Sequence, residues 1–218
     1  FYGTFAIAAL WHAPRTADTL LARFAAATPT SVMNAETWWR EGWSELPAQR
    51  NERDQRRRWP LDVQVAGSPD PLRERLEARG WHVQPQADWI ATLGLLDDDT
   101  AARDQPVLPA TLDAQAETLL MVHPGESADE EFVLRLWRAP IRLADGTPLW
   151  IGTSQTLRLN KPLAVAALWL PVNDDGRAHA LVRKALEDLD IAETPHPHGD
   201  TPVLRVRTVP ATGAASGK

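Results

Sequence analysis

Apolar and polar residues alternate through residues 61–66 (LDVQVA), the pattern of a strand that buries one face. Gly67 then turns the chain. Ser68 followed by Pro69 is typical of a helix start, because serine caps the first turn and proline suits its first position. Gly80 is placed to end that helix in a left-handed conformation. This stretch therefore predicts a strand, a tight turn and a capped helix in succession.

The second half of the chain carries mainly strand signals. They occupy residues 117–122, 131–143, 148–159, 163–170 and 203–209. Asp145 and Gly146 tolerate positive φ angles, so the second and third of these ranges are predicted to form a long hairpin. Helices are predicted at residues 89–96 and 175–189. This order of elements predicts an α+β fold, with a largely antiparallel or mixed sheet and helices packed on one face.

The distribution of core residues predicts three regions. Residues 1–58 form an N-terminal arm with short helices at 16–27 and 36–46 and a charged linker at its end. Residues 59–209 form the α+β domain. Residues 210–218 lack core residues and are expected to be disordered.

The composition excludes several classes of function. The 218 residues contain no cysteine, which removes disulfides, iron–sulfur clusters and zinc sites with thiolate ligands. The net charge of −6 gives no basic surface for nucleic acid, so nucleic acid is not expected as a partner. Ten tryptophans predict a core, or a buried groove, that is rich in indole rings.

Membrane insertion is not predicted for the chain itself. Its longest apolar runs, at residues 5–11 and 163–170, fall short of the roughly 20 residues that a spanning helix needs. The chain begins at Phe1 rather than Met, which is typical of a fragment or a processed product. Whether a membrane segment precedes the chain therefore stays open.

Arginine and tryptophan gather in the predicted hairpin. Arg135 and Trp137 lie in its first strand, and Trp150 and Arg158 lie in its second. Arginine beside tryptophan can stack, or can line a groove for a carboxylate or phosphate, which Gln64 could join from a neighbouring strand. The alternative is a structural strand pair, with tryptophan in the core and arginine stems reaching the rim.

A second candidate anion site is the turn Gly67-Ser68, because the start of a helix presents free N–H groups. Pro69 and Pro71 remove two of those donors, which favours simple capping instead. These two turn residues and the five hairpin and strand residues form the set of candidate ligand-binding positions.

Metal and catalytic motifs are weak or missing. His196, His198 and Asp200 lie close together in the sequence, but a metal needs convergent geometry and further ligands, so they remain weak candidates and no metal is predicted. The sequence contains no Gly-x-Ser-x-Gly elbow and no phosphate-binding loop. No catalytic residue and no cofactor are predicted.

Several short segments follow one another in a recognisable order. They are residues 38–47 (WWREGWSELP), 60–67 (PLDVQVAG), 79–81 (RGW), 106–109 (PVLP), 133–138 (VLRLWR) and 145–153 (DGTPLWIGT). Together with the strands and helices between residues 38 and 209, they resemble the LssY C-terminal domain family. The resemblance implies no established activity and supplies no catalytic residues.

The resemblance also implies a cellular setting. Domains of this family are often attached to, or encoded near, membrane phosphatases of the type-2 phosphatidic acid phosphatase class and DedA-like membrane proteins. A protein of either kind is the expected partner. The chain is expected to be membrane-associated through that partner or a preceding segment, and otherwise cytoplasmic. The chain lacks the Ser-Gly-His element of such a phosphatase, so phosphatase activity is not predicted for it.

Three hypotheses follow. The first is a non-enzymatic, membrane-proximal accessory domain that binds a partner protein or an anionic or lipid-headgroup ligand. The second is an uncharacterised hydrolase acting on a phosphorylated or lipid substrate, and the third is a purely structural interaction module. A pocket with convergent arginine, tryptophan and glutamine favours the first. A buried histidine–carboxylate pair in that pocket favours the second, and a flat apolar patch favours the third.

Overall fold

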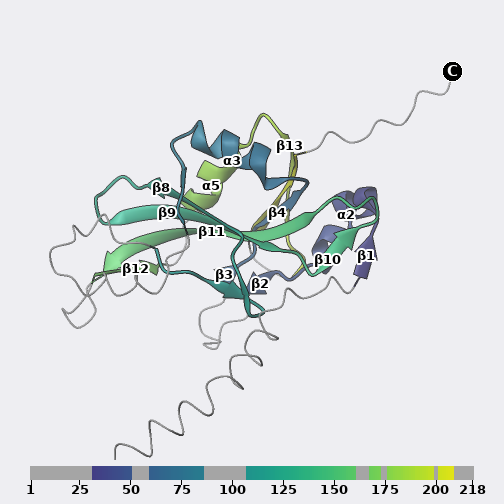
Figure 1. Ribbon diagram of the computed structural model, residues 1–218, viewed down its shortest axis with the longest axis horizontal. Coiled ribbons are helices and arrows are strands. Elements are labelled where there is room, and N and C mark those ends of the chain that lie inside the picture. Colours follow the sequence, from purple (N-terminus) through teal and green to yellow (C-terminus); the bar gives the residue numbers. More distant parts are fainter. Residues whose placement is uncertain are drawn as a thin grey trace, which may run out of the picture.

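The computed structural model describes residues 31–50, 59–85, 107–160, 167–172, 176–198 and 201–208. Within them, an eight-stranded mixed sheet forms the centre of the molecule (Figure 1). The helices predicted at residues 16–27 and 89–96, and the tail at residues 210–218, lie outside the described residues.

The sheet has the strand order β13-β14-β4-β11-β9-β8-β5, and β12 pairs with β11 beside this path. Its strands are β4 (Val63–Ala66), β5 (His82–Val83), β8 (Leu119–Pro124), β9 (Glu130–Arg138), β11 (Leu149–Asn160), β12 (Leu168–Pro171), β13 (Asp190–Pro195) and β14 (Pro202–Arg207). β14 and β4 run parallel, and the other pairs of the described sheet are antiparallel. Because β9 occupies one edge of β11, β4 and β12 share the other edge, at opposite ends of that long strand.

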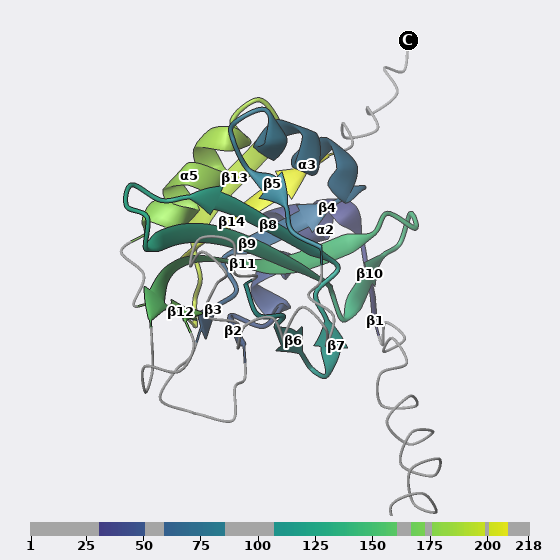
Figure 2. The ribbon, with the colours of Figure 1, turned by 60° about the vertical axis from the view of Figure 1, so that its left-hand side comes forward.

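Two helices cover one face of the sheet, which we call the α3–α5 face (Figure 2). α3 spans Pro69–Glu77 and α5 spans Arg177–Ala185. They pack on the central strands through a buried cluster that includes Leu72, Leu76, Val182, Val63, Val65, Leu134 and Leu136. Each such side chain contributes about 1.5–3 kcal/mol when fully buried. None of the described helices has the length and apolar character that a membrane-spanning helix requires.

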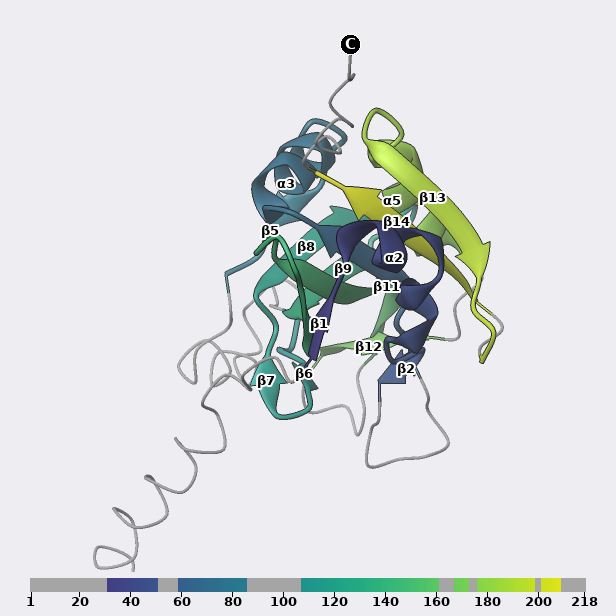
Figure 3. The same ribbon diagram turned by 90° about the vertical axis from the view of Figure 1, so that its right-hand side faces the viewer.

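Shorter elements cover the opposite face of the sheet, which we call the far face. α2 (Ala35–Arg40, Figure 3) and the 3-10 helix η1 (Gly42–Glu45) place Trp38 and Trp43 in a cluster with Trp137. Three small ribbons surround them: β1 (Ser31–Met33) with β10 (Ile141–Leu143), β2 (Gln49–Arg50) with β3 (Trp59–Pro60), and β6 (Thr111–Leu112) with β7 (Gln115–Ala116). These tryptophans therefore belong to the core, as their number in the sequence predicts.

The α+β prediction is confirmed. After β4, the backbone N–H of Asp70 donates to Ser68 Oγ (3.2 Å), which caps α3, and Gly80 follows the helix at a φ of +87°. The predicted hairpin also forms, because β9 and β11 pair antiparallel along almost their whole length. The longer helices α3 and α5 share one face, while the short α2 lies on the other.

The C-terminal part contains a strand that the sequence does not indicate. The pattern predicts a helix to residue 189 and a turn at residues 195–199, but α5 ends at Ala185 and residues 190–195 form the edge strand β13. Aspartate, glutamate and proline in this segment disfavour strands locally. Pairing of all six residues with β14 overrides that preference, because backbone hydrogen bonds to a neighbouring strand are a tertiary feature.

Candidate functional site

β11 carries a run of polar residues through the centre of the sheet. Thr153, Ser154, Gln155 and Thr156 are all buried, with Gln155 only 4% exposed. Successive side chains of a strand point to opposite faces. Ile151 and Leu157 belong to far-face clusters, so Thr153 and Gln155 point to the far face and Ser154 points to the α3–α5 face. Polar groups are rarely buried without a hydrogen-bond partner, so the partners on each face have to be identified separately.

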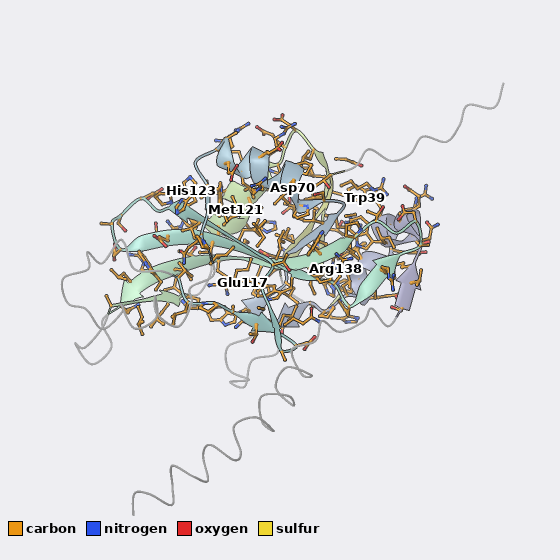
Figure 4. All side chains as sticks on the ribbon, viewed as in Figure 1. Trp39, Asp70, Glu117, Met121, His123 and Arg138 are labelled. Carbon is orange, nitrogen blue, oxygen red and sulfur yellow. The ribbon has the colours of Figure 1, made fainter. Side chains whose placement is uncertain are left out.

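On the far face, a buried arginine lies directly across from this run. Arg135 of β9 pairs in register with Thr153 and is 5% exposed. Its guanidinium donates to the carboxylate of Glu117, which is also buried, and to the Leu108 carbonyl (2.9 Å). Figure 4 shows Glu117 across the sheet from Asp70 of α3. Two anchors therefore fix the orientation of the Arg135 side chain.

The charge of Glu117 depends on opposing influences. Burial, the largest of them, raises the pKa of Glu117 above its ordinary value of 4.5, while Arg135 and Arg50 act to lower it. The net direction is upward. The two guanidiniums therefore stabilise a carboxylate that its surroundings otherwise disfavour.

A cavity of about 230 Å³ opens beside Arg135. Four parts of the chain enclose it: the β9–β11 floor, β12, the segment at residues 108–110 and the β2–β3 ribbon. Its polar lining comes from Arg50, Arg135 and Gln155, and its apolar lining includes Trp59, Leu157 and Trp169. A concave site with few polar groups set among aromatic walls is the usual form of a small-molecule site.

Several hydrogen-bond donors on the far face, two of them in residues that line this cavity, have no acceptor in the described part of the chain. They are Gln155 Nε2, Arg135 Nε, Thr153 Oγ1 and Trp137 Nε1, all buried. An unsatisfied buried polar group costs about 1–3 kcal/mol. Gln155 Nε2 and Arg135 Nε, which belong to residues lining the cavity, are both donors, so the group that would satisfy these two atoms is an acceptor. Oxygen-rich anions are acceptors of this kind.

The candidate residues predicted from the sequence are distributed over different parts of the molecule. Arg135 and Trp137 share the far face, and the Arg50 guanidinium lies 5.9 Å from the Trp137 ring. Gln64 also points to the far face, where its amide accepts from Trp38 Nε1 (2.9 Å) and donates to the Trp43 carbonyl (2.9 Å). Gln64 is thus satisfied inside the core.

The other predicted residues lie away from the cavity. Trp150 belongs to the α3–α5 face, and its indole N–H donates to the Gly67 carbonyl (2.9 Å). Ser68 caps α3, as the alternative reading predicts. Arg158, at the other end of β11, donates to Asp129 (3.3 Å) and to Glu130, which is buried (3.1 Å). The structure therefore does not bring the seven candidates into one groove.

Four residues of this site are absent from the candidates that the sequence suggested: Arg50, Glu117, Thr153 and Gln155. One signal could have found two of them. The polar run at residues 153–156 interrupts a strand that is otherwise apolar, and a buried strand has no simple reason to carry it. Arg50 and Glu117 offer no comparable signal, because single charged residues in a loop or at a strand end are ordinary.

The weak metal candidates do not gain support. His198 donates its backbone N–H to His196 Nδ1 (3.1 Å), and His196 packs edge-on against Trp43 with ring centroids 5.6 Å apart. Asp200 lies outside the described residues. Within those residues, no group of three or more His, Asp or Glu side chains is arranged to hold a metal ion.

The α3–α5 face holds a different buried polar cluster. Asp62 accepts from the Ser154 backbone N–H (2.8 Å), from the Ser154 hydroxyl and from His179 Nδ1 (3.0 Å). His179 Nε2 lies 3.1 Å from Glu193 of β13. Burial is the largest influence on His179 and lowers its pKa, but the two carboxylates together raise the pKa above 6.5.

The order of these groups is not that of a hydrolytic triad. Asp62 binds both the serine hydroxyl and the histidine, whereas a triad places histidine between serine and aspartate. Asp62 also fills a gap along β11, because it bonds to the Ser154 backbone between the stretches that pair with β4 and β12. The cluster therefore fastens α5 to the sheet.

A larger cavity of about 450 Å³ lies between α5 and the β8–β9 turn. Its lining is mostly apolar and includes Phe132 and Leu181, with Arg177 and Lys184 beside them. Arg177 donates to both carboxylate oxygens of Glu130 (3.0 and 2.7 Å). Its charge is therefore already matched by Glu130.

A comparison with protein-family models assigns the chain to a family. The model described as LssY C-terminus matches residues 43–159, which is more than half of the chain. The matched region contains the polar residues of the far-face cavity, including Arg50, Glu117, Arg135 and Gln155. No curated protein and no solved structure matches the chain. The chain belongs to the LssY C-terminus family.

Proposed function

We propose that the protein is a non-enzymatic accessory domain that binds a small anionic ligand in the far-face cavity. The observation that carries the proposal is the set of buried donors beside that cavity, above all Gln155 Nε2 and Arg135 Nε, which lack acceptors in the described residues. An anion would supply acceptor oxygens where the fold has left donors. Buried polar groups of this kind are costly unless a further function retains them.

The second part of the proposal concerns the setting. The domain acts beside a membrane protein, such as a membrane phosphatase or a DedA-like protein, and is membrane-associated through that partner or through a preceding segment. Membership of the LssY C-terminus family supports this part. Fractionation of cells that express the full-length gene product tests it, and recovery only in the soluble fraction would contradict it.

A thermal-shift screen of carboxylates, phosphates and headgroup analogues tests the ligand. An anion that binds only the folded state raises the melting temperature, by an amount that grows with the logarithm of its concentration relative to its Kd. We expect at least one anion to raise it in the wild-type protein, and Arg135→Ala to abolish the increase. Gln155→Leu should weaken binding by about tenfold or more, because a hydrogen bond to a charged group contributes about 1.5–3 kcal/mol.

Two controls make the result decisive. Arg158→Gln removes a guanidinium outside the cavity and should leave the shift unchanged. Gln155→Leu keeps every ion pair, so it remains informative if Arg135→Ala fails to fold. If no anion raises the melting temperature, the purely structural module becomes the better account. If a bound phosphorylated compound is turned over, the hydrolase alternative replaces this proposal.

A further inference from the structure

We infer that the cavity between α5 and the β8–β9 turn is a second binding site, which takes a small uncharged aromatic molecule. The inference concerns the α3–α5 face and does not depend on the anion site proposed on the far face. Three features of the cavity carry it: its volume, the chemistry of its lining, and a buried carboxylate, Glu130, that fixes its two walls relative to each other.

The volume of the cavity suits a small organic molecule. At about 450 Å³ it falls within the roughly 300–1,000 Å³ that is usual for ligand sites. A cavity of about 150 Å³ with apolar walls is already large enough to bind benzene. The space therefore accommodates a body of two fused rings.

One wall of the cavity is a second stripe of α5. Val182 faces the core, whereas Arg177, Leu181 and Lys184 line the cavity at the helical spacing of three to four residues. Leu181 is only half-buried, so part of its apolar surface remains available to a ligand. Ala180 also lines the cavity and is exposed, and its small side chain leaves the mouth of the cavity open.

The other wall is aromatic. Phe132 of β9 is buried, and the ring centroid of His123 on β8 lies 6.2 Å from that of Phe132. The guanidinium carbon of Arg177 lies 5.3 Å from the centre of the Phe132 ring. Aromatic rings favour edge-to-face and offset contacts with other rings, and guanidinium groups stack on them. A flat aromatic ligand can make both kinds of contact here.

The polar groups of the lining do not require a charged ligand. The carboxylate of Glu130 accepts from Arg177 through both oxygens (3.0 and 2.7 Å), which matches the charge of that guanidinium. His123 Nδ1 lies 2.7 Å from the carbonyl oxygen of the next residue, and it donates there because a carbonyl oxygen only accepts. Lys184 and Glu126 are exposed and carry opposite charges, which water solvates. An uncharged molecule therefore fits the lining.

Glu130 connects the two walls. It is 3% exposed and binds Arg177 of α5, and the same carboxylate accepts from the backbone N–H of Glu126 in the turn (3.3 Å). The Gly125 N–H donates to the Glu130 carbonyl (2.9 Å), and a side chain at Gly125 would approach Glu130 to 2.6 Å. The turn is thus held in place beside the helix. A cavity whose walls are fixed before binding loses little conformational entropy when a ligand enters.

The experiment compares three probes with the same two-ring body and the substituent at the same ring position. Naphthol is flat and uncharged near neutral pH, decahydronaphthol lacks aromatic faces, and naphthoate is an anion. Calorimetry measures binding, and NMR shifts of the Leu181 methyl groups locate it. We expect naphthol to bind about two- to tenfold more tightly than decahydronaphthol, because of the aromatic contacts with Phe132 and His123. Naphthoate should bind no more tightly than naphthol.

Three variants test the location and the charge. Ala180→Trp fills the mouth of the cavity and should weaken naphthol binding by about tenfold or more. Ala78→Trp adds the same ring at an exposed alanine after α3, outside the cavity, and is the matched control that should leave the affinity unchanged. Lys184→Gln should also leave naphthol binding unchanged, because the ligand carries no charge. All three positions are exposed, and circular dichroism establishes that each variant folds.

Each contrary outcome has a defined meaning. If naphthoate binds about tenfold more tightly than naphthol and Lys184→Gln removes the difference, the cavity takes anions and the inference is wrong. Equal binding of decahydronaphthol would contradict the selection of aromatic rings. If no probe binds, or if Ala180→Trp binds naphthol as the wild type does, this cavity is not the site. The proposed anion site is unaffected by these results, because Arg135→Ala and Gln155→Leu test it separately.

Discussion

Ser154 and its two neighbours in β11 differ in how their buried polar groups are bonded, although Thr156 Oγ1, on the same side as Ser154, also lacks a partner in the described residues. On the α3–α5 face, Ser154 bonds to Asp62, which also holds His179, and that imidazole reaches Glu193. On the far face, the neighbouring residues Thr153 and Gln155 keep donors without acceptors in the described residues. The two sides belong to the same strand and are buried to a similar extent.

This difference separates structure from candidate function. A fully bonded cluster fixes one arrangement of the elements that supply it, here α5, β11, β13 and the residue before β4. An unsatisfied set of donors stabilises nothing by itself and lowers stability unless a ligand or water completes it. Substitutions in the α3–α5 cluster should therefore lower the stability of the fold. Substitutions of the far-face donors should instead weaken ligand binding. Three predictions test this contrast.

The largest effect is expected for Asp62→Ala. The change leaves the Ser154 N–H and the imidazole of His179 buried without their main acceptor. Breaking a buried pair in this way costs about 3–5 kcal/mol. Urea unfolding followed by circular dichroism measures the loss. The matched control is Glu77→Ala, which removes an exposed carboxylate of α3 and should change the free energy of unfolding by less than about 0.5 kcal/mol.

A loss below about 1 kcal/mol for Asp62→Ala would mean that the cluster does not fasten α5 to the sheet. In that case the two sides of β11 would not differ in the way described. The ligand proposal would survive, because it depends on Arg135 and Gln155 rather than on Asp62.

A smaller effect, with a defined pH dependence, is expected for His179→Gln. The two carboxylates raise the folded-state pKa of His179 above 6.5. Its stabilising contribution is therefore fully present below about pH 6.5 and is lost as the pH rises through the raised folded value. The variant should lose about 1.5–3 kcal/mol of unfolding free energy on the acidic side, as for hydrogen bonds to charged groups, and less on the alkaline side.

Thermal melts of wild type and variant across that pH range measure how the difference in stability between them decreases as the pH rises. His82→Gln, which replaces an exposed histidine, is the control and should leave the pH profile unchanged. A His179→Gln profile parallel to that of the wild type would show that the carboxylates do not raise the folded-state pKa of His179, and would contradict this prediction.

The smallest effect is expected for Thr153→Val on the far face. Thr153 is fully buried, and its hydroxyl lacks a partner in the described residues. Replacing an unsatisfied polar group with an apolar group of the same shape should be neutral or stabilising by up to about 1 kcal/mol. Denaturant unfolding measures it beside Ser154→Ala on the other face, which removes a bonded hydroxyl and should destabilise. A loss of more than about 2 kcal/mol for Thr153→Val would indicate that the hydroxyl is bonded after all.

Much of the fold could be predicted because its signals are local. The alternation at residues 61–66, the Ser68 cap and the long hairpin each depend on neighbours in the sequence, and each is present. The strand β13 was missed because its residues disfavour strands and only β14 stabilises it. The candidate site was predicted in part: Arg135 lies in the cavity, but Trp150 and Arg158 do not.

The sequence by itself determined the periodic strands, the capped helix α3, the tryptophan-rich core and the absence of cysteine chemistry, because propensity and composition act over a few residues. Only the tertiary structure decided which polar groups are satisfied. Register places Thr153 opposite Arg135, alternation sends Ser154 to the other face, and distant segments bring Glu117 to the guanidinium. Partners of this kind lie far apart in the chain. Their burial and pairing, and therefore the candidate site, are known only from the folded structure.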